Sequence, residues 1–114
     1  MLSSFPAHNT FHINSDGRVV IEDTLTGRFT TICANQWDDL DASVICRHLN
    51  VSQTGHAIIL PPSQQYNKSV FGVHCTGFET DPEHCQVDSY DYTGTCQWAD
   101  DAGVQCGSVQ NVTR

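Results

Sequence analysis

The sequence has few basic residues. Five of its 114 residues are Lys or Arg, against 13 Asp and Glu, and the formal net charge at pH 7 is -8. Because the long-range Coulomb interaction of such a chain with a polyanion is repulsive, this balance argues against nucleic acid or an anionic membrane surface as a partner. A cationic partner or a bridging metal ion fits the charge. An acidic surface that only keeps the protein soluble fits it equally well.

Long apolar stretches are also missing. The longest, residues 57–60, ends at Pro61 and Pro62, whereas a helix needs roughly 20 apolar residues to cross a bilayer. Residues 1–12 have neither a basic start nor a long apolar stretch, so we do not expect a signal peptide there. We predict no direct membrane insertion by this chain, and any anchor would lie outside it.

The sequence signatures of common enzyme classes are absent as well. We find no G-x-S-x-G, no H-E-x-x-H, no P-loop and no dinucleotide-binding fingerprint. The six histidines show no spacing typical of paired metal ligands. The protein is therefore predicted not to be an enzyme.

The sequence does contain six separated cysteines and three glycosylation sequons. No C-x-x-C pair occurs, which argues against a zinc site or a redox pair, and the even count indicates three disulfides formed in an oxidising compartment. We predict an extracellular protein, either secreted or the ectodomain of a membrane protein. Spacing alone does not choose among the many pairings of six cysteines. The sequons begin at Asn50, Asn67 and Asn111, and the cysteines are Cys33, Cys46, Cys75, Cys85, Cys96 and Cys106.

Patterning divides the chain into three parts. Residues 1–15 are polar and unpatterned and are predicted to be an extension or linker, residues 16–107 a folded domain, and residues 108–114 a tail or linker. Within the domain, runs of β-branched residues and turn residues predict strands at residues 18–22, 28–33, 57–60, 69–75 and 103–106.

One segment has helical spacing. Ala42, Ile45, Cys46 and Leu49 recur at the period of a helix, which we predict to run from Asp41, as its N-cap, to Leu49. Ile45 and Leu49 would share the face that packs on the sheet. Strands around one helix predict an α+β protein.

Five motifs occur in step with the cysteines. They are Gly17-Arg18-Val19, residues 29–33 (F-T-T-I-C), Trp37 followed by residues 41–49 (D-A-S-V-I-C-R-H-L), residues 75–79 (C-T-G-F-E) and residues 100–106 (D-D-A-G-V-Q-C). In this order the chain resembles the scavenger receptor cysteine-rich (SRCR) domain in its six-cysteine group A form, over residues 17–106.

The resemblance implies a fold and a disulfide pairing. The implied fold is compact, with a curved antiparallel sheet cradling one main helix and three disulfides. The implied pairs are Cys33 with Cys96, Cys46 with Cys106, and Cys75 with Cys85.

The resemblance also implies where a cation would bind. Members of the family often bind ligands through divalent cations held by an Asp-Asp pair after the cysteine of the second strand and by the Glu of C-x-G-x-E. Here the pair reads Ala34-Asn35, while Glu79 remains. One carboxylate and one amide do not replace three anionic ligands, so we predict no cofactor and at most weak Ca²⁺ binding. The candidate ligands that remain are Glu79, Asn35, Asp38 and Asp39.

Ligand contacts are predicted in a loop between the last cysteines. Tyr90 and Tyr92, flanked by Asp88 and Asp91, are candidates because rigid aromatic rings on loops favour recognition. The resemblance implies a non-catalytic extracellular module, monomeric in isolation, that binds a protein or glycan ligand, with a cationic ligand as one version. One alternative is an accessory domain of a secreted enzyme, such as a trypsin-like protease or a lysyl oxidase. Another is a rigid spacer or self-associating unit.

Overall fold

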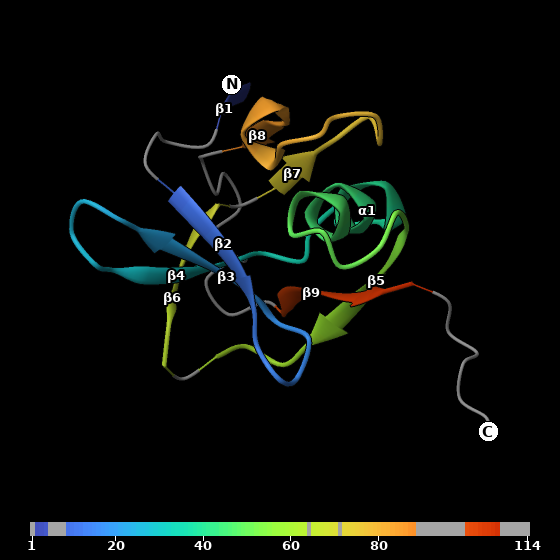
Figure 1. Ribbon diagram of the computed structural model, residues 1–114. Coiled ribbons are helices and arrows are strands. Elements are labelled where there is room, and N and C mark those ends of the chain that lie inside the picture. Colours follow the sequence, from blue (N-terminus) through green and yellow to red (C-terminus); the bar gives the residue numbers. More distant parts are fainter. Residues whose placement is uncertain (1, 5–8, 64, 71, 89–99, 108–114) are drawn as a thin grey trace.

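Short strands make up most of the chain. The computed structural model describes residues 2–4, 9–63, 65–70, 72–88 and 100–107, and Figure 1 shows the path of the chain through them. The elements, in chain order, are β1 (Leu2–Ser4), β2 (Asn9–Ile13), β3 (Val19–Asp23), β4 (Phe29–Ile32), α1 (Asp39–His48), β5 (Gly55–Leu60), β6 (Asn67–Val70), β7 (Gly72–His74), the 3-10 helix η1 (Pro82–His84), β8 (Gln86–Asp88) and β9 (Asp101–Cys106).

The strands form three small sheets. A four-stranded sheet has the order β2-β3-β4-β6, a three-stranded sheet has the order β1-β8-β7, and β5 pairs with β9. All pairings are antiparallel except that of β4 with β6. The helix α1 packs against β5 and β9, and Figure 1 shows it beside this pair. The predicted α+β class is confirmed, and the one curved sheet of the prediction is divided into three.

The fold extends further towards the N-terminus than predicted. Strand β2 lies inside the predicted extension, yet it pairs along its whole length with β3, with Phe11 opposite Ile21. Phe11 is buried in the core and Ile13 packs against it. Strand β2 therefore belongs to the folded part of the chain, although the predicted domain begins at residue 16. A strand that buries one face needs only alternate apolar residues, and this segment has just two of them. The predicted tail, residues 108–114, lies outside the described residues.

The N-cap of the helix lies three residues earlier than predicted. Its N-cap is Asp38, whose side chain accepts a hydrogen bond from the backbone of Asp41, while the Asp41 side chain accepts one from the backbone of Asp38. This reciprocal pair is a capping box, so Asp41 is the third helical residue and not the N-cap. Asn50, with φ 59°, follows the C-cap Leu49. Within the described residues, no helix is long and apolar enough to cross a membrane.

The helix and β5 approach closely at a glycine. A Cβ on Gly55 would lie 2.6 Å from the Cys46 sulfur and 2.8 Å from the Ala42 carbonyl oxygen, distances that side chains do not tolerate. Gly55 is also the first residue of β5, which therefore begins two residues before the predicted start at residue 57. The predicted strand at residues 69–75 is divided between β6 and β7, which belong to different sheets.

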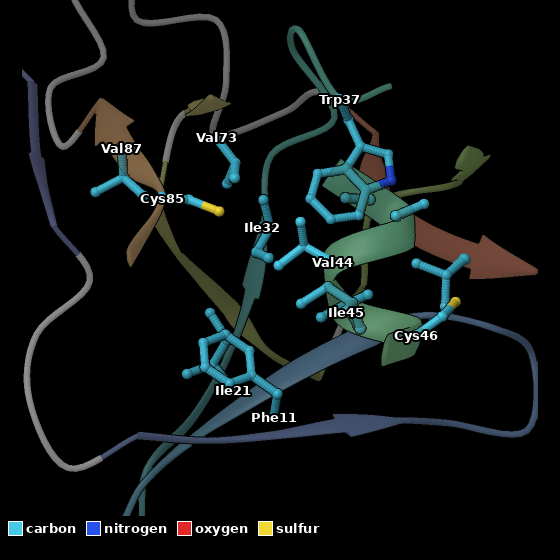
Figure 2. Packing of buried hydrophobic residues seen from close by; sticks show 14 residues of the cluster. Phe11, Ile21, Ile32, Trp37, Val44, Ile45, Cys46, Val73, Cys85 and Val87 are labelled. Atoms are coloured by element: carbon cyan, nitrogen blue, oxygen red, sulfur yellow. The ribbon is translucent and has the colours of Figure 1, made fainter. Parts of the chain in front are cut away.

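The core fills the space between the sheets and α1. Figure 2 shows Val44 and Ile45 of the helix facing Ile32 and Ile21 of the four-stranded sheet. Trp37 is also buried, and its indole N–H donates to the Gly103 carbonyl at 2.8 Å. Other buried members of the cluster include Phe11, Val19, Cys46, Val73, Cys85, Val87, Ala102 and Val104.

A buried ion pair joins two of the sequence motifs. The Arg18 guanidinium donates to the Asp101 carboxylate at 2.7 Å and to the Pro61 carbonyl at 2.7 Å. The Asp101 side chain is fully buried and also accepts from the Thr31 hydroxyl and the Ser63 backbone N–H. A buried carboxylate needs this number of partners to offset its lost hydration. The first and last motifs therefore meet as one structural unit.

Two disulfides fasten the described part of the chain. Cys46 of α1 is bonded to Cys106 of β9, with the Cα atoms 5.6 Å apart, and Cys75 is bonded to Cys85. Both are pairs that the family resemblance implies. The first spans 60 residues and the second spans 10, so the first removes more conformational freedom from the unfolded chain.

Candidate functional site

The candidate site is the segment 75–81, which we call the 75–81 loop. It connects β7 to η1, and the Cys75–Cys85 disulfide closes it at its base, with the Cα atoms 4.7 Å apart. The loop lies next to α1 near the top of Figure 1. Loops of this kind on a rigid scaffold commonly carry the contacts of a binding protein.

A carboxylate inside the loop organises its backbone. The Glu79 carboxylate accepts the Thr76 N–H with both oxygens, at 3.0 and 3.1 Å, and the Gly77 N–H at 3.1 Å. Burial acts to raise the pKa of Glu79, but these hydrogen bonds outweigh it and hold the pKa below its ordinary value of 4.5. Gly77 has φ 100°, which a residue with a side chain rarely adopts. The C-T-G-F-E motif is thus a folded turn closed by its own glutamate.

Two side chains of α1 form hydrogen bonds with the backbone of the 75–81 loop. Arg47, in the last turn of α1, donates to the carbonyl oxygens of Gly77 and Glu79, the latter at 2.9 Å. At the other end of the helix, Asp41 accepts the Cys75 N–H at 2.8 Å. Burial raises the pKa of Asp41 to about 7, although the backbone hydrogen bonds from Cys75 and Asp38 favour its ionised form. Both ends of the loop motif are therefore tied to one helix.

The loop presents an apolar side chain to solvent. Phe78 is 90% exposed, the most exposed of the large apolar residues among those described. The preceding residue, Gly77, lies against Leu40 of α1, because a Cβ on Gly77 would be 2.8 Å from a Leu40 methyl carbon. Leu40 is itself 49% exposed. Phe78 and Leu40 thus flank the contact between the loop and the first turn of the helix.

Three of the four candidate cation ligands form hydrogen bonds with the protein backbone, and the fourth is exposed in a turn. Glu79 closes the loop, Asp38 caps the helix, and Asp39 accepts the Ala57 N–H at 2.7 Å and lies 3.6 Å from a His56 ring nitrogen. Asn35 lies exposed in the turn before Trp37.

One group of potential metal ligands comes together in the described part of the chain. Its members are Cys75, Glu79 and Cys85, whose ligand atoms lie within 4.8 Å of one another. The two cysteines share a disulfide, so they offer no thiolate. The prediction of at most weak Ca²⁺ binding stays a prediction.

Several predicted site residues lie outside the described residues, namely Tyr90, Asp91, Tyr92, Cys96 and Asn111. Cys33 is disulfide-bonded, and Cys96 is its implied partner. The backbone of Asp88 ends β8, opposite Leu2 and Gly72.

Of the other sequons, Asn50 is exposed after α1 and Asn67 is the first residue of β6. The sequence analysis did not single out Phe78, which is exposed on this loop. An aromatic residue between a glycine and a glutamate, in a loop closed by a short-range disulfide, is a pattern that points to it.

Comparison with known proteins identifies the family. The family model for the scavenger receptor cysteine-rich domain matches residues 11–107, and its start inside β2 agrees with the early start of the fold. The chain belongs to the scavenger receptor cysteine-rich family. The resemblance seen in the sequence motifs is thereby confirmed, and we call the protein an SRCR domain from here on.

The SRCR domain is similar to curated relatives and to solved structures. It is 35% identical to human CD5 antigen-like over 102 residues, which is 84% of this chain and 28% of that protein, and 37% identical to mouse CD5 antigen-like over 67% of this chain and 22% of that protein. The chain therefore spans less than a third of these relatives.

Among solved structures, the dimeric form of the mouse MARCO SRCR domain matches with TM-score 0.66 and 27% identity, over 92% of this chain and 94% of that one. The third SRCR domain of murine neurotrypsin matches with TM-score 0.60 and 26% identity, over 86% and 95%.

Proposed function

We propose that this SRCR domain is a non-catalytic extracellular module that binds a protein or glycan ligand on its surface. Family membership supports the proposal, and so do the two disulfides of the described residues, which require an oxidising compartment. The observation that carries it is the 75–81 loop, which is tied at both ends to α1 and holds Phe78 in solvent. A rigid loop that exposes an aromatic ring binds with little loss of conformational entropy.

Several polar side chains that the structure describes have structural partners. No cysteine among them is free, so they supply no thiol nucleophile. Ser43 bonds to the backbone of Gly55 at the junction of helix and strand, and the exposed His12 pairs with Glu22 at 3.1 Å. These contacts support a binding role over a catalytic one.

We propose that ligand binding does not need a divalent cation. The hydrogen bonds of Glu79 satisfy the one carboxylate that the family's cation site retains. We expect calorimetry to find Ca²⁺ binding of millimolar strength or weaker, because affinity rises with the number of anionic ligands. The double variant Ala34→Asp, Asn35→Asp should strengthen it. A micromolar site in the unmodified domain would contradict the argument.

The direct test is a ligand screen. We would apply the labelled monomeric domain to arrays of glycans and of extracellular proteins, once with Ca²⁺ and once with a chelator. The proposal expects at least one saturable ligand whose binding survives the chelator. Finding no ligand, or only binding that the chelator abolishes, would contradict it.

The similarity to an SRCR domain of neurotrypsin favours a second candidate function. In that case the domain is an accessory part of a secreted enzyme, where it positions a substrate or regulates catalysis carried out elsewhere. The full-length gene product decides between the two, because a downstream protease or oxidase domain would support the second. Light scattering over a concentration series tests the predicted monomer against the self-associating alternative.

A further inference from the structure

Phe78 and Leu40 are exposed apolar side chains that flank the contact between the loop and α1, and acidic residues adjoin both in the sequence. We define the 40/78 patch as these two side chains together with the Gly77 backbone that lies against Leu40. They come from the loop and from the first helical turn, segments 38 residues apart in the sequence that packing brings together. Phe78 is 90% and Leu40 49% exposed. Both side chains are exposed although they stand on backbone that hydrogen bonds hold in place.

The charges around the 40/78 patch are mostly negative. Asp39 directly precedes Leu40, Asp38 caps the same turn, and Glu79 follows Phe78 with a pKa held below its ordinary value. Two basic side chains lie near these carboxylates. The Arg47 guanidinium is directed at the loop carbonyls, and His56 lies beside Asp39.

The counter-charges do not balance the carboxylates. Arg47 is the one permanent cation among these groups, against three carboxylates, and it lies part-buried under the loop. The net charge of -8 adds a negative background. The outer surface of the patch therefore attracts cations.

Resting on the proposed function, we propose that the 40/78 patch is a docking surface for a cationic protein segment that carries an apolar residue between lysines or arginines. The apolar residue covers Phe78 and Leu40, and its basic neighbours face the flanking carboxylates. A second copy of this chain is disfavoured as the occupant, because two identical acidic patches would repel each other across the contact. An acidic partner is disfavoured for the same reason.

The test uses three short peptides and amide NMR spectra of the folded domain. The first peptide has a Leu-Leu centre between pairs of lysines, the second replaces the leucines with serines, and the third replaces the lysines with glutamates. We expect saturable shifts at the amides of Leu40, Gly77 and Phe78 with the first peptide only. The affinity should fall as salt rises from about 0.05 to 0.5 M, because screening removes the charge term.

Matched variants locate the site. Phe78→Ser should weaken the first peptide about tenfold or more, because central aromatic contacts dominate such surfaces, while Phe78→Tyr should keep most of the affinity. Leu25→Ser is the control, since Leu25 is 74% exposed at the turn between β3 and β4, on the other side of Figure 1 from the loop. It should leave binding unchanged.

Four results would overturn the proposal. These are the absence of shifts at the patch with the first peptide, equal binding of the glutamate peptide, equal weakening by Leu25→Ser, and a dimer that Phe78→Ser abolishes. A ligand that emerges from the screen but binds Phe78→Ser normally would refute the 40/78 patch and leave the proposed function standing. An empty screen would refute the proposed function itself.

Discussion

Replacing Glu79 tests whether its carboxylate holds the 75–81 loop. Glu79→Ala removes the acceptor of the Thr76 and Gly77 N–H groups. A hydrogen bond to a charged group contributes roughly 1.5 to 3 kcal/mol. Glu79 is only partly buried, so we expect the lower end of this range, a loss of about 1.5 kcal/mol in local stability. Glu79→Gln keeps one acceptor oxygen and should cost less.

The assay is amide hydrogen exchange, because the effect is local. In Glu79→Ala the amides of Thr76 and Gly77 should exchange roughly tenfold faster for each 1.4 kcal/mol lost, while amides of β5 and β9 stay protected. Glu83→Gln, which removes a nearby charge without touching these bonds, is the control. If Glu79→Ala left exchange at Thr76 and Gly77 unchanged, the carboxylate would not organise the loop.

The pH dependence of the same amides gives a second measurement. The pKa of Glu79 is lower in the folded protein than its ordinary value of 4.5, so the ionised form stabilises the fold. That contribution is complete above about pH 4.5 and is lost as the pH falls through the folded pKa. Protection of Thr76 and Gly77 should therefore decline in acid, and Glu79→Gln should remove the decline.

The remaining predictions concern the scaffold. Ile45→Ala should lower the free energy of unfolding by roughly 2 to 5 kcal/mol in urea titrations, since Ile45 is fully buried, and Leu49→Ala should cost less because Leu49 is half-buried. Equal costs would contradict this ranking. Arg18→Ala should cost roughly 3 to 5 kcal/mol because it removes the guanidinium that is paired with the buried Asp101 carboxylate, and a loss below about 1 kcal/mol would refute the ion pair's role. Burial raises the pKa of Asp41 from 3.8 to about 7, so the folded protein binds the proton of this carboxyl more tightly than the unfolded chain does. The resulting contribution to the free energy of unfolding is complete below pH 3.8. It is lost as the pH rises towards 7, at up to about 1.4 kcal/mol per pH unit. Asp41→Asn should flatten the dependence of the unfolding free energy on pH between 3.8 and 7. A pKa below 3.8 for Asp41, measured by NMR, would refute this prediction.

Local patterns were enough to predict the helix and the class of the fold. Ile45 and Leu49 lie four residues apart, and this spacing places them on one face in any helix, whatever surrounds it. Asparagine at position 50, with φ 59°, likewise has a left-handed conformation that its own chemistry tolerates. The sequence motifs identified the family because their order and their spacing relative to the cysteines are properties of the chain alone.

Tertiary contacts decided the rest. Strand β2 has only two apolar residues, Phe11 and Ile13, and it is the pairing with β3 that makes this polar segment a strand. Asp41 has the chemistry of an N-cap, but packing under the loop buries it as the third residue of the helix. Phe78 is exposed on a loop whose backbone accepts a hydrogen bond from Arg47, a residue about 30 positions earlier in the sequence. Sequence determines what each side chain can do, but a surface formed by two separate segments exists only once the chain has folded.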